Sequence, residues 1–215
     1  MNIKNKYSTK PQISRMPKTF SKQEKQAIRN ALIERGKELF STYGLKKTTV
    51  ADLADAGGIA QGSFYHFFNS KEELYFDILE VEQAKSEHFL EEIVISSPSA
   101  KEAIRKVIKG TFELFRTNPF IRRTYDSWDY ELMLRKLPPE RLQNHLITDT
   151  IRVKNIITRM QQKNELIHAR PEVVAGLLRA IAILYFHQDD VGREIFPDVI
   201  DLLADIVARG LVNDK

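Results

Sequence analysis

Apolar residues recur at three- and four-residue spacing through most of the chain, and this pattern is the strongest constraint on its fold. The 215 residues include only 9 glycines and 8 prolines, and most of these stand where one periodic segment ends and the next begins. Such spacing places one face of an α-helix against a core, whereas strict alternation would indicate strands. The sequence therefore predicts an all-α protein of about nine helices.

Several expected helices begin with a Ser or Thr followed three residues later by an acid. At this spacing the two side chains can cap free backbone amides at the helix start. The pairs begin at Ser21, Thr49, Ser70 and Ser99, and Gly44 should end the first helix. We expect helices over residues 22–43, 50–56, 60–67, 71–96, 100–117, 120–136, 139–163, 171–187 and 196–211.

Positive charge is concentrated near the N-terminus. Residues 1–69 hold 12 Lys and Arg against 5 Asp and Glu, a net charge of +7, whereas residues 70–215 hold 21 against 24, a net charge of −3. Residues 1–20 carry five basic residues, no acid and no apolar period, so we expect a flexible arm. A basic first third suits a polyanion such as nucleic acid, although a run of charge is more often only a solvated surface.

The composition excludes several classes of protein. The chain has no cysteine, which rules out disulfides, thiolate metal sites and cysteine nucleophiles. No apolar run approaches the roughly 18–20 residues of a membrane span, and no signal peptide is recognisable, so we expect a cytoplasmic protein. Catalytic sequence motifs are missing, and we expect neither enzyme activity nor a cofactor. His187, Asp189 and Asp190 could supply metal ligands, but polar residues after an apolar helix are more often a solvated end.

Two short helical segments, separated by Gly57-Gly58, have the layout of a helix-turn-helix unit. The surrounding residues 21–76 resemble the signature of the tetracycline-repressor (TetR-like) family. The matching features are Thr48 or Thr49 before the second helix, Asp52-Leu53-Ala54, Gly58, Gly62, the aromatic block Phe64–Phe68 and Lys71–Leu74. The resemblance implies a DNA-binding domain at 21–69, after the arm at 1–20, and a ligand-binding and dimerisation domain at 70–215.

A recognition helix needs small residues where backbones approach and polar side chains near its N-terminus. Gln61 and Ser63 are our first choices for reading base edges, while Phe64 and Phe68 should face the core. Helix N-termini favour phosphate, because free amides and the helix dipole point there. The candidate DNA-binding residues are Lys46, Lys47, Thr48, Thr49, Gln61, Gly62, Ser63, Tyr65, His66 and Lys71. Two positions depart from the family pattern: Ala60 replaces a capping Ser, and Phe67 replaces a Tyr whose hydroxyl could contact phosphate.

Residues 173–186 contain one charge in 14 positions and are apolar on both faces. Such a helix is either central to one core or lies between its own core and a second subunit, and the last helix shows the same excess of apolar positions. The family resemblance implies a dimeric four-helix bundle here. The candidate interface residues are Leu177, Ile181, Leu184, Leu203 and Ile206.

The middle of the chain is rich in large aromatic side chains and methionine. This composition suits an apolar pocket, although an aromatic stripe is core more often than pocket. The candidate ligand-binding residues are Phe112, Phe115, Tyr125, Trp128, Met133, Met160 and Tyr185. Asp126 and Asp129 beside Trp128 leave open a cationic ligand.

The residues and the resemblance together predict a homodimeric, ligand-responsive transcriptional regulator. We expect a repressor that binds a palindromic double-stranded DNA operator and is released by a small apolar or aromatic molecule. The alternative from another class is a helical interaction protein that has the same architecture without operator specificity.

Overall fold

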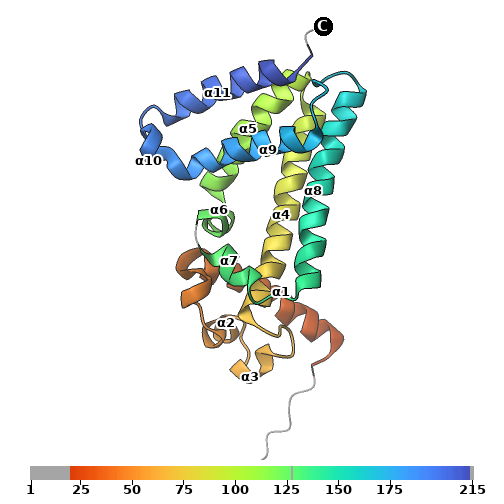
Figure 1. Cartoon of the computed structure of the whole chain (residues 1–215). Helices are drawn as coiled ribbons and strands as arrows, with labels where there is room; N and C mark the ends of the chain where they lie inside the picture. The colour runs from red at the N-terminus through yellow and green to blue at the C-terminus, as the bar shows by residue number, and fades with distance from the viewer. Residues whose placement is uncertain (1–19, 127, 214–215) are drawn as a thin grey trace, which may run out of the picture.

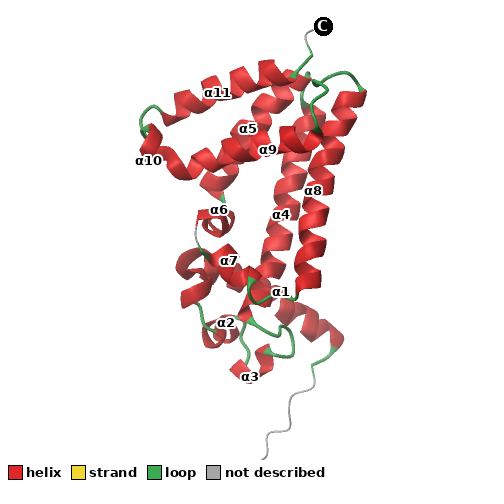
Figure 2. Cartoon of the chain, in the orientation of Figure 1, coloured by secondary structure: helices red, strands yellow, loops and turns green. Residues whose placement is uncertain are grey.

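The computed structural model describes residues 20–126 and 128–213, with the side chains of residues 142–152 left out of the description. These residues form eleven α-helices and one 3-10 helix and no strand, apart from an isolated bridge between Leu166 and Val212. Figure 2 shows the helices joined by short connections. The elements are α1 (Lys22–Lys47), α2 (Val50–Ala56), α3 (Gln61–Phe64), α4 (Lys71–Ser96), α5 (Ala100–Thr117), α6 (Pro119–Asp126), α7 (Asp129–Leu134), α8 (Pro139–Gln162), α9 (Pro171–Ile183), η1 (Leu184–His187), α10 (Gln188–Val191) and α11 (Phe196–Leu211). The all-α prediction is confirmed.

The N-terminal helices start as the capping pattern predicts. The Ser21 hydroxyl accepts from the Glu24 amide while the Glu24 carboxylate accepts from the Ser21 amide, and Thr49 and Asp52 repeat this arrangement at α2. The helix α1 runs past its expected end, because Gly44 is a kink with φ of 77° and not a stop. That backbone conformation favours glycine, which explains the residue type at this point. The expected arm lies outside the described residues, apart from Phe20, whose ring lies 5.9 Å from that of Phe67.

The turn between α2 and α3 depends on Gly58, whose φ is 70°. No side chain caps α3 at Ala60, and the helix is shorter than expected. Its expected C-terminal part is a turn, because the amides of His66 and Phe67 donate to the carbonyls three residues back instead of four. The recognition segment is therefore one short helix followed by a tight turn.

The long helix α4 connects the two ends of the molecule. It starts beside α1–α3 and runs to the opposite end, where α5, α9 and α11 pack together (Figure 1). The helix α8 follows α4 along its length: Arg141 near its start pairs with Asp77, and Arg159 near its end lies 3.9 Å from Glu91. A shift of α4 would therefore displace both the helix-turn-helix unit and the helices at the opposite end, α5, α9 and α11.

Two expected helices are interrupted. The segment 120–136 divides into α6 and α7, and the chain turns so that the carboxylate of Asp129, at the start of α7, reaches the backbone of α1. The segment 171–187 ends as α9 followed by η1, and Gly192, with φ of 105°, stops the extra short helix α10. Among the described residues, no helix combines the length and hydrophobicity that crossing a membrane requires.

Buried side chains form two cores. The first unites α1–α4 with α6 and α7 and includes Phe40, Phe64, Phe68 and Tyr75. The second lies between α5, α8, α9 and α11 and includes Ile108, Ile157, Ile181 and Ala204. Partly buried Tyr185 packs against both.

Candidate DNA-binding surface and ligand cavity

The recognition segment divides its side chains between core and solvent. Phe64 and Phe68 are buried, as expected, whereas Gln61 and His66 are exposed and Tyr65 is 56% exposed. Burial of the two phenylalanines fixes the orientation of the segment, because their rings occupy the first core. The polar residues of α3 and the following turn therefore face outward together, with Ser63 half-buried beside them.

Gly62 has open space in front of it. A Cβ atom at this position would meet no atom of the chain within 4 Å, and its φ lies outside the range that favours glycine. Neither packing nor backbone conformation therefore explains a glycine at this exposed position. Close approach of an external surface is consistent with the missing side chain.

The candidate phosphate-binding residues fall into two groups. Lys46, Lys47 and Thr49 are exposed near the junction of α1 and α2, and the Thr49 hydroxyl lies 2.7 Å from a carboxylate oxygen of Asp52, to which it donates. Thr48 is 2% exposed, and its hydroxyl donates to the Gly44 carbonyl at 2.8 Å. The side chain of Thr48 therefore stabilises the end of α1 and does not face solvent.

The ammonium group of Lys71 is also hydrogen-bonded within the chain. Its ammonium group donates to the carbonyl oxygens of Leu45 at 2.6 Å and Thr48 at 2.7 Å. These carbonyls lie at the C-terminal end of α1, where the partial negative charge of a helix attracts a cation. Lys71 joins α4 to α1, a role that its position at a helix N-terminus did not indicate.

Two adjoining cavities lie among α4, α5, α8 and α9. The first, which we call the polar chamber, has a volume of about 750 Å³ and is lined by Gln83, Ser86, Glu87, Leu90, Thr111, Leu114, Phe115, Ile121, Tyr125, Asp126, Val153, Arg179, Ala182, Ile183, Phe186 and His187. The second, which we call the apolar chamber, has about 270 Å³ and is lined by Leu90, Val94, Ala103, Ile104, Val107, Thr111, Val153, Ile156, Ile157, Met160, Leu166, Val174, Ala175, Leu178, Arg179, Ala182 and Leu211. Leu90, Thr111, Val153, Arg179 and Ala182 belong to both chambers, so these are neighbouring parts of one site.

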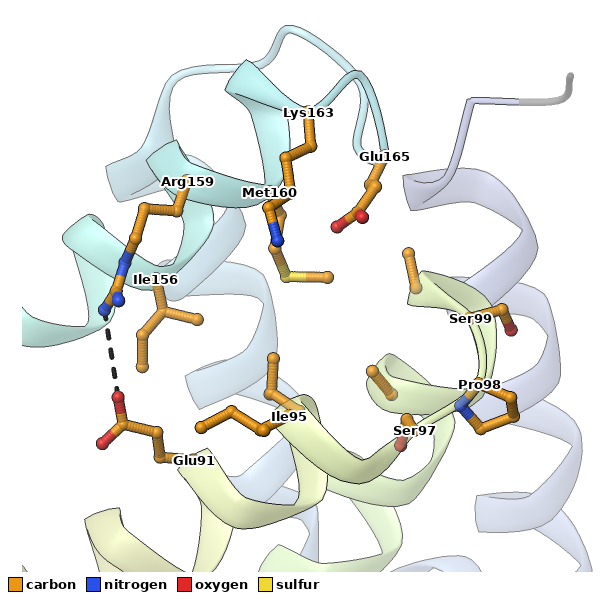
Figure 3. Close-up of a pocket in the computed structure, with 13 residues that line it drawn as sticks. Glu91, Ile95, Ser97, Pro98, Ser99, Ile156, Arg159, Met160, Lys163 and Glu165 are labelled. Atoms are coloured by element: carbon orange, nitrogen blue, oxygen red, sulfur yellow. Dashed lines mark ion pairs between the residues drawn. The ribbon is translucent and has the colours of Figure 1, made fainter.

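A third pocket, which we call the end pocket, adjoins the apolar chamber at the end of the molecule farthest from α3. It has about 330 Å³, and Figure 3 shows it between the end of α4, the start of α5 and the end of α8. Val94, Ala103, Ile156 and Met160 line both this pocket and the apolar chamber. Charged groups surround its mouth, including the Glu91–Arg159 pair drawn in Figure 3.

The predicted ligand-binding residues lie at different sites in the structure, and only some of them line the chambers. Phe115 and Tyr125 line the polar chamber, and Met160 lines the apolar chamber. Phe112 and Tyr185 line a separate groove of about 260 Å³. Trp128 is 72% exposed and Met133 is fully buried in the first core, so neither reaches a chamber. Asp129 does not face a ligand either, because its carboxylate is buried against α1.

Several polar residues of the chambers were missed by the sequence analysis, among them Gln83, Thr111 and Arg179. A signal existed for Arg179, since it is the single charge in residues 173–186.

An exposed apolar face runs over α9 and α11. Leu177 and Ile206, two of the predicted interface residues, are 40% and 54% exposed, and Val173 and Leu202 beside them in sequence are 50% and 59% exposed. Leu184 and Leu203 are half-buried against the second core. Ile181 is only 5% exposed and belongs to that core, which corrects its assignment to an interface.

The possible metal ligands are dispersed or already paired. His187 Nδ1 lies 3.0 Å from Asp190, and Asp189 pairs with Arg193. No group of three or more His, Asp or Glu side chains suited to a metal ion occurs in the part of the chain that the structure describes. This region is an exposed surface with local ion pairs.

The short helices α2 and α3, the glycine turn and the exposed polar face define a helix-turn-helix protein. A model of the family described as bacterial regulatory proteins, tetR family, matches residues 32–78. The repressor KstR2 of Rhodococcus jostii is 47% identical over 55 residues, which are 26% of this chain and 27% of that protein, so the likeness covers about a quarter of KstR2. The regulator TtgR of Pseudomonas putida is 27% identical over 200 residues, covering 86% of this chain and 89% of TtgR.

The overall fold is shared with solved structures. A TetR-family transcriptional regulator from Pectobacterium atrosepticum superposes with a TM-score of 0.68 at 21% identity, covering 91% of this chain and 99% of that one. The match to the tetR family of bacterial regulatory proteins covers residues 32–78, where the helix-turn-helix unit lies. The predicted resemblance is confirmed over these residues.

Proposed function

We propose that this chain is a homodimeric repressor whose residues 21–69 bind a palindromic DNA operator in the bacterial cytoplasm. The observation that carries the proposal is the outward face of α3 and of the turn after it, where Gln61, Tyr65 and His66 are exposed and Gly62 leaves room for a closely approaching surface. Gln can pair bidentately with adenine, and a recognition helix presents such side chains to the major groove. Lys46 and Lys47 add positive charge for the phosphate backbone.

The exposed apolar face of α9 and α11 supports dimerisation with a second copy of the chain. Leu177, Leu202 and Ile206 are each at least 40% exposed, and exposure of these apolar side chains to water does not stabilise a monomer. A twofold pair would place the same face of each copy against the other. A twofold dimer also presents two recognition helices, as a palindromic operator requires.

The two chambers support regulation by a small molecule. Tyr125 and Asp126 of α6 line the polar chamber, and the neighbouring Arg123 pairs with Asp129, which holds the end of α1. The helix α4 lines both chambers and contacts α1 through Lys71. A ligand that prefers one arrangement of α4 and α6 can therefore bias the position of the DNA-binding helices.

Selection of DNA from a random double-stranded library by the full chain tests the proposal. We expect enrichment of an inverted repeat, and loss of that enrichment in Gln61→Ala. Uniform binding of all sequences would favour the alternative of an interaction protein without operator specificity. A second test is reciprocity: an effector that weakens operator binding must itself be bound more weakly, by the same factor, when operator is present.

A further inference from the structure

Arg179 is a charged residue without an ion-pair or hydrogen-bond partner among the described side chains, and it stands between the two chambers. It is the single charge in residues 173–186 of an otherwise apolar helix. Ala175, Leu178 and Ala182 accompany it on the side of α9 that faces the apolar chamber. Arg179 is itself an exposed residue, but it lines both chambers and so lies on a different side of α9 from the apolar face that carries Leu177.

The lining of the apolar chamber leaves one place for the polar end of a ligand. Of its lining residues, only Thr111 and Arg179 are polar, and both also line the polar chamber. A molecule that fills the apolar chamber thus brings its polar group out beside Arg179. An amine at this point would be repelled by the guanidinium, whereas a carboxylate can accept two parallel hydrogen bonds from it.

The neighbouring polar groups complement an acid that also carries a hydrogen-bond donor. The Thr111 hydroxyl donates to the Val107 carbonyl at 2.9 Å and so offers only its lone pairs to a ligand. The Gln83 amide nitrogen donates to the Tyr125 hydroxyl at 3.2 Å, while its buried Oε1 atom accepts no hydrogen bond within the described part of the chain. Arg179 supplies donors, and Gln83 supplies an acceptor that burial makes costly to leave unused.

Two acids, Glu87 and Asp126, also line the polar chamber. Glu87 already takes part in an interaction, and Asp126 ends α6 as an exposed residue. Neither lines the apolar chamber, where the body of a ligand is held. Among the described residues, Arg179 is therefore the one charged side chain that lines both chambers.

We propose that the effector is an organic acid, with an apolar body in the apolar chamber, its carboxylate on Arg179 and a hydroxyl or N–H group directed to Gln83. This assignment rests on the proposed function of the chambers as the effector site. It narrows the effector from any small apolar molecule to an amphipathic anion.

Matched probes on the full chain test the chemical class. The probes are decanoic acid, decan-1-ol and decylamine, with 4-phenylbutyric acid, 4-phenylbutan-1-ol and 4-phenylbutylamine as a second set, each titrated calorimetrically. We expect each acid to bind at least about tenfold more tightly than its alcohol and amine, the difference that charge-assisted hydrogen bonds supply. Arg179→Gln should lower acid affinity by about tenfold and leave the alcohols unchanged, with Arg179→Lys intermediate because it keeps the charge without the fork.

The control variant is Arg170→Gln, which removes the same charge from the start of α9 outside both chambers. It should bind the acids as the unmodified chain does. Equal or tighter binding of alcohols or amines, no binding of any acid, or unchanged acid affinity in Arg179→Gln would each overturn the assignment. Operator release is measured separately. Release of operator by an amine would support the proposed function but contradict the assignment of an acid as effector. Acids that bind through Arg179 without changing operator affinity would support the ligand class but contradict its regulatory role.

Discussion

The backbone amide of Leu45 donates a hydrogen bond to the carboxylate of Asp129 at 3.0 Å, in a buried contact between residues 84 positions apart. The Leu45 amide follows the kink at Gly44, where the regular hydrogen bonding of α1 is interrupted. Arg123 of α6 lies 3.3 Å from the same carboxylate oxygen. One acid thus connects α1, α6 and α7, and this connection lies directly before Lys46 and Lys47 of the proposed DNA-binding surface.

Replacing Asp129 with Ala should destabilise the fold. The substitution leaves the buried Leu45 amide without its carboxylate acceptor and removes the ion pair with Arg123, and we expect a loss of about 2 kcal/mol in the free energy of unfolding. Urea denaturation measures it. Asp126→Ala is the matched control, because Asp126 is exposed, and it should change stability by less than about 0.5 kcal/mol. Equal losses for the two variants would contradict the structural role of Asp129.

Substitution of Lys71 should change the stability of the fold, whereas substitution of Lys47 should change DNA affinity. Lys71→Ala removes the cation from the backbone carbonyls at the end of α1, so we expect a loss of about 2 kcal/mol in unfolding free energy with little change in the salt dependence of DNA binding. Lys47→Ala removes an exposed charge, so stability should hold while the slope of log affinity against log salt falls by about 1. A reduced salt slope in Lys71→Ala at unchanged stability would instead assign Lys71 to phosphate contact.

Gly62→Ala should weaken DNA binding without harming the fold. Space is open around Gly62, and Ala is the better helix former by about 1 kcal/mol, so stability should be unchanged or higher. The added methyl group would stand between α3 and the groove, and operator affinity measured by fluorescence anisotropy should fall. Gly58→Ala provides the contrast, since its φ of 70° makes any side chain costly and stability itself should fall. Full operator affinity in Gly62→Ala would remove α3 from the interface.

The parts of the fold that the sequence predicts are those encoded locally. Caps such as Ser21 with Glu24 and the glycine turn before α3 act over a few residues, and they occur as expected. Gly44 shows the limit, because a kink stabilised by Asp129 continues a helix that the local signal would end. Contacts across such separations leave no trace in a three- or four-residue period.

The candidate site was harder to predict for the same reason. Trp128 and Met133 share the aromatic and sulfur chemistry of a pocket, yet one is exposed and the other is core. Periodicity separates the faces of α9 but does not say which face meets the core and which meets solvent, so Ile181 and Leu177 were grouped together. Only the packing of α9 against α5 and α8 in the second core distinguishes them.

Glu82 should make stability depend on acid pH. It is 3% exposed, and although burial raises the pKa of its carboxyl, hydrogen bonds from Lys37, Lys85 and Asn118 outweigh burial and hold the pKa below its usual 4.5. A lowered folded-state pKa contributes stability that is fully present above the unfolded-state pKa and is lost as pH falls through the folded-state value.

Unfolding free energies of the unmodified chain and Glu82→Gln, measured from about pH 7 to about pH 3.5, check this. The difference between them should be constant above about pH 5.5 and shrink below about pH 4.5. A difference that grows as pH falls would reverse the assigned sign.

Leu177→Glu combined with Ile206→Glu should convert a dimer into a folded monomer. Both side chains are exposed in the single chain, so charge there costs the monomer little, whereas pairing two copies would bury unpaired carboxylates. Sedimentation should show the mass of one chain. Thermal unfolding should show that this monomer remains folded, and its binding to a two-site operator should be weakened. Ile181→Glu should instead disrupt folding, because Ile181 is core, and Ile95→Glu, at a 77% exposed position of α4, should leave the dimer intact. A double variant that still sediments as a dimer would show that α9 and α11 do not form the interface.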